Sequence, residues 1–245
     1  MTACHTCAIR LRGACDVMVN GDMPGPEVLP RSHLRADAKR NLVRVGEPIR
    51  DIIVVCEGIA FRHRVLASGQ RQILSFVLPG EVVSAAMVVT PFFSYMVQAL
   101  TPVRYCAIPR GDLYRKLTDG SSPGFSQYIS NAVLREKWRS DELIVDLGTR
   151  DAMGRIVHLL LSLHSRLAAA GLERDGWIEL PLRRIHLAEA TGITTVHVGR
   201  VLHRLKADGL VVFDGDRIQL PNREALAALA DLRIEDLTPP PPDAA

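Results

Sequence analysis

Residues 180–210 read LPLRRIHLAEATGITTVHVGRVLHRLKADGL, and this stretch predicts two helices joined by a tight turn. A first helix is expected over residues 183–190. Gly192 breaks it, and the hydroxyl of Thr194 can cap a second helix that begins at Thr195. Apolar residues in the second helix recur at i, i+3, i+4 and i+7, which indicates one buried face. They are Val198, Val201, Leu202 and Leu205. The pattern is that of a helix-turn-helix, although any helical hairpin with a glycine turn shares it.

The opposite face of the second helix begins with small side chains and then offers an arginine. Such a face can enter a DNA major groove, where arginine donates two hydrogen bonds to guanine. The candidate DNA-contacting residues are Arg183, Thr194, Thr195, Val196, His197, Gly199, Arg200, His203 and Arg204. Nearby Arg184, His186 and Lys206 add basic character that suits phosphate contacts.

Residues 210–220, LVVFDGDRIQL, alternate apolar and polar side chains around a DGD turn, which predicts a β-hairpin. A helix-turn-helix followed by a small hairpin is a winged arrangement. We expect this domain over residues 150–225, opened by an apolar helix that starts at Asp151 and ends at Gly171. Residues 226–245 are expected to hold a C-terminal helix and a disordered tail, because TPPPPDAA cannot form the interior of a helix or strand.

Residues 26–122 contain short strand-like runs, such as NLVRVG and DIIVVCEGIAFRHRVL, separated by glycine and proline turns. Regular spacing of this kind predicts an antiparallel β-barrel or sandwich rather than a parallel sheet. Barrels of this type are a familiar place for a small ligand. With the helical C-terminal part, the chain is assigned to the α+β class.

A long helix is predicted over residues 123–149. Its apolar stripe is interrupted by charged residues and would leave apolar surface exposed unless the helix pairs with a second one. We therefore interpret it as a dimerisation helix; the alternative is a connector packed on its own barrel. The candidate dimerisation residues are Ile129, Ala132, Val133, Asp141, Leu143, Ile144 and Leu147.

Five cysteines need an explanation, and three of them lie close together in residues 1–25. These are Cys4, Cys7 and Cys15. Closely spaced thiolates hold zinc or an iron–sulfur cluster, but three ligands are one short of a closed site. Cys56 lies in a strand-like run where it is expected to be buried, whereas Cys106 precedes a proline and can lie at an accessible edge, so Cys106 is chosen. His5 is judged incidental, and a flexible tail without a metal is the alternative.

The composition narrows the remaining possibilities. At 245 residues and 47% hydrophobic content the chain can form one large or two ordinary domains, and a net charge of +3 says little about partners. The sequence contains no run of about 18 apolar residues, so it predicts no membrane span. The N-terminal residues lack the apolar core of a secretory signal, so we expect a cytoplasmic protein without disulfides. The sequence contains no HExxH, nucleophile elbow, phosphate loop or paired-acid motif, so we expect no enzyme.

The order of elements, the turn PGEVV at residues 79–83 and GITTVHVGRVLHRL at residues 192–205 resemble the CRP/FNR superfamily of bacterial transcription regulators over essentially the whole chain. The resemblance implies a jelly-roll barrel like that of cyclic-nucleotide-binding domains and a homodimer on double-stranded DNA. It also implies contact with RNA polymerase.

The segments CHTCAIRLRGAC and CAIP are similar to the oxygen-sensing FNR branch and its FnrN-like members, in which four cysteines hold a [4Fe-4S] cluster. This similarity implies ligand roles for Cys4, Cys7, Cys15 and Cys106. It also implies an oxygen-responsive regulator whose cluster favours a dimer on a palindromic promoter site. Open alternatives are a zinc site, a thiol redox switch or another effector.

Two departures from the family pattern limit the resemblance. FNR-type recognition helices carry Glu-x-x-Ser-Arg, whereas this chain has Val196, Gly199 and Arg200, so a different palindrome is expected. Relatives that bind cyclic nucleotides hold the phosphate with an Arg-Ser pair, whereas residues 92–96 here read FFSYM. Nothing charged is placed there to pair with a phosphate, so no cyclic nucleotide is expected.

Asp141 and Glu142 lie within the predicted dimer helix. If they lie on the seam, they would face like charges across a two-fold axis and keep the apo form weakly paired. This hypothesis is wrong if Asp141→Ala and Glu142→Ala leave the apo-protein monomeric at micromolar concentration.

Overall fold

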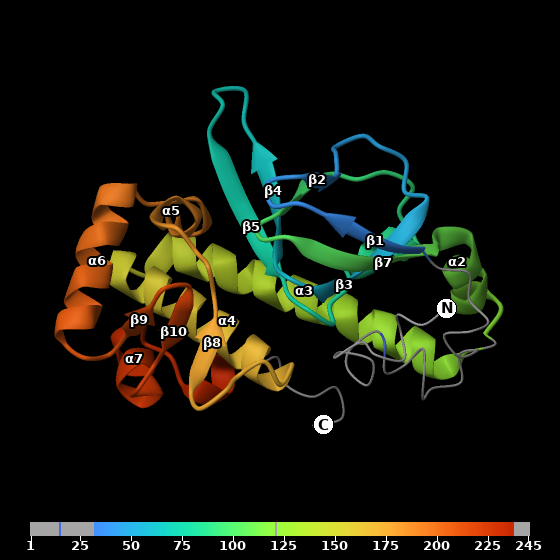
Figure 1. The fold of residues 1–245 in the computed structure, drawn as a ribbon. Coiled ribbons are helices and arrows are strands. Elements are labelled where there is room, and N and C mark those ends of the chain that lie inside the picture. Colours follow the sequence, from blue (N-terminus) through green and yellow to red (C-terminus); the bar gives the residue numbers. More distant parts are fainter. Residues whose placement is uncertain (1–14, 16–31, 121, 238–245) are drawn as a thin grey trace. The chain divides into compact units, whose positions relative to one another are not determined.

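The computed structural model describes Cys15, residues 32–120 and residues 122–237 (Figure 1). The strands are β1 Ser32–Ala36, β2 Asn41–Val43, β3 Asp51–Glu57, β4 Ala60–Val65, β5 Arg71–Val77, β6 Met96–Ala99, β7 Val103–Pro109, β8 Trp177–Glu179, β9 Val212–Asp214 and β10 Arg217–Gln219. The helices are η1 Ala85–Val88, α2 Arg110–Thr118, α3 Pro123–Thr149, α4 Ala152–Ala169, α5 Arg184–Thr191, α6 Thr195–Ala207, α7 Arg223–Leu229 and η2 Ile234–Leu237.

The chain forms two compact units. The first unit comprises the chain up to Arg64 together with Leu74–Lys137, and the second comprises Val65–Ile73 and everything from Trp138 onward. The division falls inside α3, so each unit contains part of this helix.

Two antiparallel sheets build the first unit, with strand orders β1-β7-β3 and β2-β6-β4-β5. Side chains of both sheets enter one core, which includes Val54, Val55 and Cys106 from the first sheet and Val97 and Ala99 from the second, and β3 is buried on both of its faces. The arrangement is a jelly roll of two sheets rather than one closed barrel, and the predicted α+β class is confirmed. β1, which the sequence reasoning did not predict, pairs with β7 along its whole length.

The second unit contains the winged helix-turn-helix. Helix α4 packs against α5, α6 and α7, and its N-terminus is capped by Asp151, whose carboxylate accepts the Gly154 N–H at 2.8 Å. The predicted hairpin is confirmed as β9 and β10. A third strand, β8, pairs with β10 and was not predicted; with only three residues it is too short for a periodic pattern.

The end of α3 is fixed within the second unit by a buried ionic cluster. The His158 imidazole on α4 lies 2.7 Å from the Asp146 carboxylate, and Arg150 also pairs with Asp146. The Arg150 guanidinium donates to the Ala230 carbonyl at 3.1 Å. The last turn of α3 is therefore bonded both to α4 and to the chain just after α7.

Among the described residues, no helix combines the length and the apolar character that a membrane crossing requires.

Gly58, in the turn between β3 and β4, gives a direct test of this fold. Its φ is +78°, and an added Cβ would lie 2.1 Å from the Pro102 carbonyl oxygen. Gly58→Ala is expected to lower the free energy of unfolding by about 2–4 kcal/mol, because a rigid backbone contact adds to the left-handed strain. Denaturant unfolding of the purified protein measures this.

Gly46→Ala is the matched control, since Gly46 has a φ of +79° but no atom within 4 Å of the added Cβ. This change should cost only the backbone strain, about 1 kcal/mol. Equal losses at the two positions would show that the close approach of Pro102 to Gly58 does not exist in solution.

Candidate nucleic-acid interface and cysteine site

The turn between α5 and α6 is formed by the residues that the sequence singled out. Gly192 ends α5 in the left-handed conformation, with φ of 69°, and its N–H donates to the Ala188 carbonyl at 2.9 Å. The Thr194 hydroxyl caps α6 by accepting the N–H of His197 at 3.2 Å. The predicted helix-turn-helix is therefore confirmed, with its turn held at both ends.

Helix α6 separates its faces clearly. Val198, Val201 and Leu205 are buried and Leu202 is half-buried, so this face belongs to the core of the second unit. The opposite face is open to solvent, and Val196 there is 63% exposed. The exposed candidate residues are Arg183, Thr194, Thr195, Val196, His197, Arg200, His203 and Arg204, while Gly199 is half-buried.

Gly199 allows the two helices to share one basic surface. A Cβ at this position would lie 3.4 Å from the Arg184 guanidinium, so the side chain of α5 lies close over the α6 backbone. Arg184 was counted with the basic face but not with the candidate DNA contacts. The contact of Arg184 with the backbone at Gly199 joins two helices, so no local sequence pattern shows it.

His186 completes the cap of α5, with its Nδ1 accepting the Arg183 N–H at 3.1 Å. Burial lowers the pKa of His186 below its ordinary value; Glu189 opposes this, and Arg71 and Arg183 lower the pKa further. The imidazole therefore stays neutral near pH 7, as its role as a hydrogen-bond acceptor requires.

The start of β5 also contacts α5 within the second unit. The Arg71 guanidinium pairs with Glu189 at 2.7 Å, and the Gln72 amide donates to the Ala190 carbonyl at 3.3 Å. These contacts join residues more than a hundred positions apart, so sequence reasoning had no means of finding them.

Two of the four candidate cysteine ligands lie in the part of the chain that the structure describes. Cys106 is 4% exposed, and its Sγ lies 3.3 Å from the His33 Nδ1 across the β1–β7 pair. The expectation that Cys106 lies at an accessible edge is wrong, because β7 is the central strand of its sheet. Cys56 on β3 is buried, as predicted.

Cys15 is partly buried and packs against the core that contains Cys106. Burial raises the pKa of the Tyr128 hydroxyl on α3; Arg135 opposes this, and Glu81 and then Cys15 raise it further. Cys15 therefore lies near α3. Cys4 and Cys7 lie outside the described residues, within which no group of three or more His, Cys, Asp or Glu side chains could hold a metal ion.

The candidate dimerisation residues divide into two sets. Ile129 and Ala132 are each 6% exposed and belong to the core of the first unit, so they are corrected from interface to core residues. Val133, Asp141, Ile144 and Leu147 are exposed, and Leu143 is half-buried. Leu134 and Val145, 60% and 41% exposed, extend the exposed apolar surface of α3 and were not predicted.

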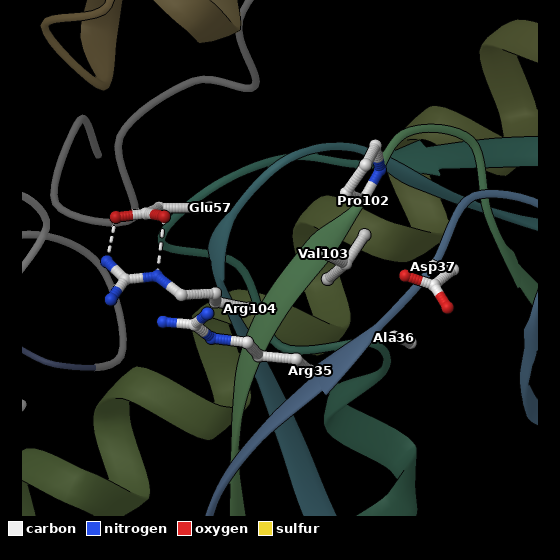
Figure 2. Close-up of a pocket in the computed structure, with 7 residues that line it drawn as sticks. All are labelled: Arg35, Ala36, Asp37, Glu57, Pro102, Val103 and Arg104. Carbon is white, nitrogen blue, oxygen red and sulfur yellow. Dashed lines mark hydrogen bonds and ion pairs between the residues drawn. The ribbon is translucent and has the colours of Figure 1, made fainter.

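An open hollow of about 530 Å³ lies on the first unit and involves β1, the end of β3 and the start of β7. Figure 2 shows Glu57 facing the guanidinium of Arg104, with Arg35 extending beside it. Arg35 and Arg104 are direct cross-strand neighbours, and Glu57 offsets the repulsion expected between two like charges.

Comparison with known proteins agrees with both units. Residues 34–119 match the cyclic nucleotide-binding domain, and residues 154–229 match the Crp-like helix-turn-helix domain. The class of protein is thus a transcription regulator that joins a jelly roll of the cyclic nucleotide-binding type to a winged helix of the Crp type.

Two curated relatives and one solved structure are similar to the chain over most of its length. The chain is 29% identical over 230 residues to the transcriptional activatory protein AadR of Rhodopseudomonas palustris, covering 92% of this chain and 93% of AadR. It is 24% identical over 193 residues to the fumarate and nitrate reduction regulatory protein of Salmonella typhimurium, covering 78% and 75%. The structure of FixK2 from Bradyrhizobium japonicum superposes with a TM-score of 0.74 at 24% identity, over 82% of this chain and 98% of FixK2. The chain belongs to the CRP/FNR superfamily of transcription regulators.

Proposed function

We propose that this regulator is a homodimer that binds a palindromic promoter site and responds to oxygen or redox state through a [4Fe-4S] cluster. The observation that carries the DNA-binding role is the exposed face of α6, which follows a fixed turn and presents Arg200 outward. A cytoplasmic location and contact with RNA polymerase at the promoter follow from that role. We propose no enzymatic activity.

Arg200 is the proposed base-reading residue. Its guanidinium can donate two hydrogen bonds to guanine, whereas Val196, one turn earlier, can make only an apolar contact such as with a thymine methyl group. The basic residues around them supply phosphate contacts that set the position of the helix without selecting the sequence.

Arg200→Ala is expected to weaken specific binding by about 1–3 kcal/mol and to relax selectivity at one base pair in each half-site. The measurement is fluorescence anisotropy with a duplex selected from random sequences and its single-base variants. Lys206→Ala is the control, because the exposed Lys206 should weaken all duplexes alike and reduce the salt dependence by about one charge. If Arg200→Ala weakens binding to the selected duplex and to its single-base variants by the same factor, Arg200 contacts only phosphate.

The four cysteines fit a cluster in their chemistry, since thiolates are the usual ligands of iron–sulfur clusters. Cys4, Cys7, Cys15 and Cys106 would hold it, and a bound cluster would supply oxygen-labile iron–thiolate chemistry. The buried position of Cys106 on a central strand would give one rigid ligand. The position of Cys15 near Tyr128 would place this one N-terminal ligand next to α3. Zinc or a thiol redox switch is the second candidate.

Anaerobically purified protein is expected to show a broad absorption band near about 400 nm, with bound iron and sulfide, that bleaches in air. Cys106→Ala should lose this band. Cys56→Ala is a close control, because Cys56 is also buried and lies on the neighbouring strand β3, and it should keep the band. A colourless wild-type protein that contains zinc or no metal would overturn the cluster and leave the DNA-binding proposal intact.

The dimer proposal rests on the exposed apolar side chains of α3. Ile144 is 68% exposed, so Ile144→Asp should leave the fold intact but bury a charge at the proposed interface. We expect this variant to be monomeric at micromolar concentration by sedimentation equilibrium, where the wild-type protein forms dimers. Val89→Asp is the control, since Val89 is 53% exposed but lies outside α3. If the Ile144→Asp variant forms dimers that are as stable as those of the Val89→Asp variant, the dimer interface lies elsewhere.

We further propose that no cyclic nucleotide is bound. Residues 92–96 offer no charged side chain, and Phe93 among them is buried in the core. Arg62, a buried cation of the same unit, is already paired with Glu136. Glu142, which was expected to repel its symmetry mate, lies 3.4 Å from Arg150 of its own chain, and this pairing offsets the expected repulsion.

A further inference from the structure

A buried ion pair joins β4 to α3 within the first unit. The Arg62 guanidinium donates to the Glu136 carboxylate at 2.8 Å and to the Ser75 hydroxyl at 2.6 Å. The side chains of Arg62 and Glu136 are only 11% and 20% exposed. Both partners are therefore largely withdrawn from water.

Two further donors meet the same carboxylate. The Ser84 hydroxyl donates to Glu136 at 2.9 Å, and the backbone N–H of Ala85 donates to its other oxygen at 2.7 Å. The Arg62 guanidinium also lies over the ring of Tyr95, 5.4 Å from its centre. Both oxygens of the carboxylate are thus engaged by groups that lie far from α3 in sequence.

The charge of Arg62 depends on this arrangement. Burial by itself lowers the pKa of the Arg62 guanidinium, but Glu136 and then Tyr95 raise it, and the net direction is upward. An isolated buried cation would be costly, so Arg62 requires an anion at this place. In this structure α3 supplies that anion.

We propose that Arg62, Ser84 and the Ala85 N–H form a carboxylate-binding site whose permanent ligand is Glu136, carried on α3. These three donors come from the jelly roll, and the anion comes from the helix. The anion that these donors bind therefore belongs to the same chain. If Glu136 is shortened, a small free carboxylate such as acetate can take its place.

The site also has a consequence for assembly, which rests on the proposed dimer. Val133 and Leu134 lie three and two residues before Glu136 and are exposed. Because Glu136 fixes this part of α3 against the jelly roll, loss of the carboxylate should also disturb the proposed dimer surface. Acetate should then restore it.

The test is chemical rescue of the full-length Glu136→Ala variant. Its thermal midpoint should fall by about 5–10 °C relative to the wild-type protein, since a buried cation loses its partner. The midpoint should then rise with acetate concentration at constant ionic strength, as expected for a ligand that binds only the folded state. Chloride and neutral acetamide should have no such effect.

Glu57→Ala is the matched control, because Glu57 pairs with Arg104 but is 50% exposed. Its midpoint should change little and should not respond to acetate. Adding Arg62→Met to Glu136→Ala removes the cation and should abolish the acetate response. Sedimentation equilibrium of Glu136→Ala with and without acetate tests the assembly consequence separately from the site.

Glu136→Gln keeps the shape of the side chain and guards against a failure of Glu136→Ala to fold. It should also lower the midpoint, and Arg62→Met should recover part of that loss. The proposal is overturned if folded Glu136→Ala does not respond to acetate beyond chloride, or if Glu136→Gln is as stable as the wild-type protein. A monomeric wild-type protein would overturn only the dimer, since the thermal measurements do not depend on it.

Discussion

An ionised carboxylate can leave water only where hydrogen-bond donors replace its hydration, and this requirement determines how the first part of α3 lies on the jelly roll. Glu136 meets three such donors, and Ile129 and Ala132 enter the core on the preceding turns of the same helix. Apolar burial alone would allow the helix to slide or turn slightly. The charge-assisted bonds allow only one register, because any shift would leave Arg62 or Glu136 buried without its partner.

The helix-turn-helix could be predicted residue by residue because its determinants are local. Gly192 is needed for a left-handed turn, Thr194 for a cap, and Val198, Val201 and Leu205 for a face with the period of a helix. Each of these features depends on neighbours within a few positions. The β9–β10 hairpin and the bounds of α4 follow from equally local patterns.

The cysteine site and the surface of α3 show where such reasoning stops. A proline after Cys106 suggested a strand edge, but β1, which covers β7 on that side, has a weak pattern of its own and is mostly exposed. Ile129 and Ala132 have the spacing of an interface and also the spacing of a core, and periodicity cannot distinguish the two. The partners of Glu136 lie about 50 and 74 positions away, so its role depends on the tertiary fold.

The same helix belongs to two units, and each end is held by its own polar and charged side chains. Glu136 binds the first half to the jelly roll, while Asp146, Arg150 and His158 bind the last turns to the DNA-binding unit. The division between the units, at Lys137 and Trp138, thus lies between the residues that make these two sets of bonds. Exposed apolar side chains occur on both sides of it, from Val133 and Leu134 to Ile144 and Val145. A partner helix paired along this whole surface, as we propose, would have to contact both halves at once. Dimerisation would then add apolar contacts to α3 on both sides of this division, where each unit by itself holds only its own part of the helix.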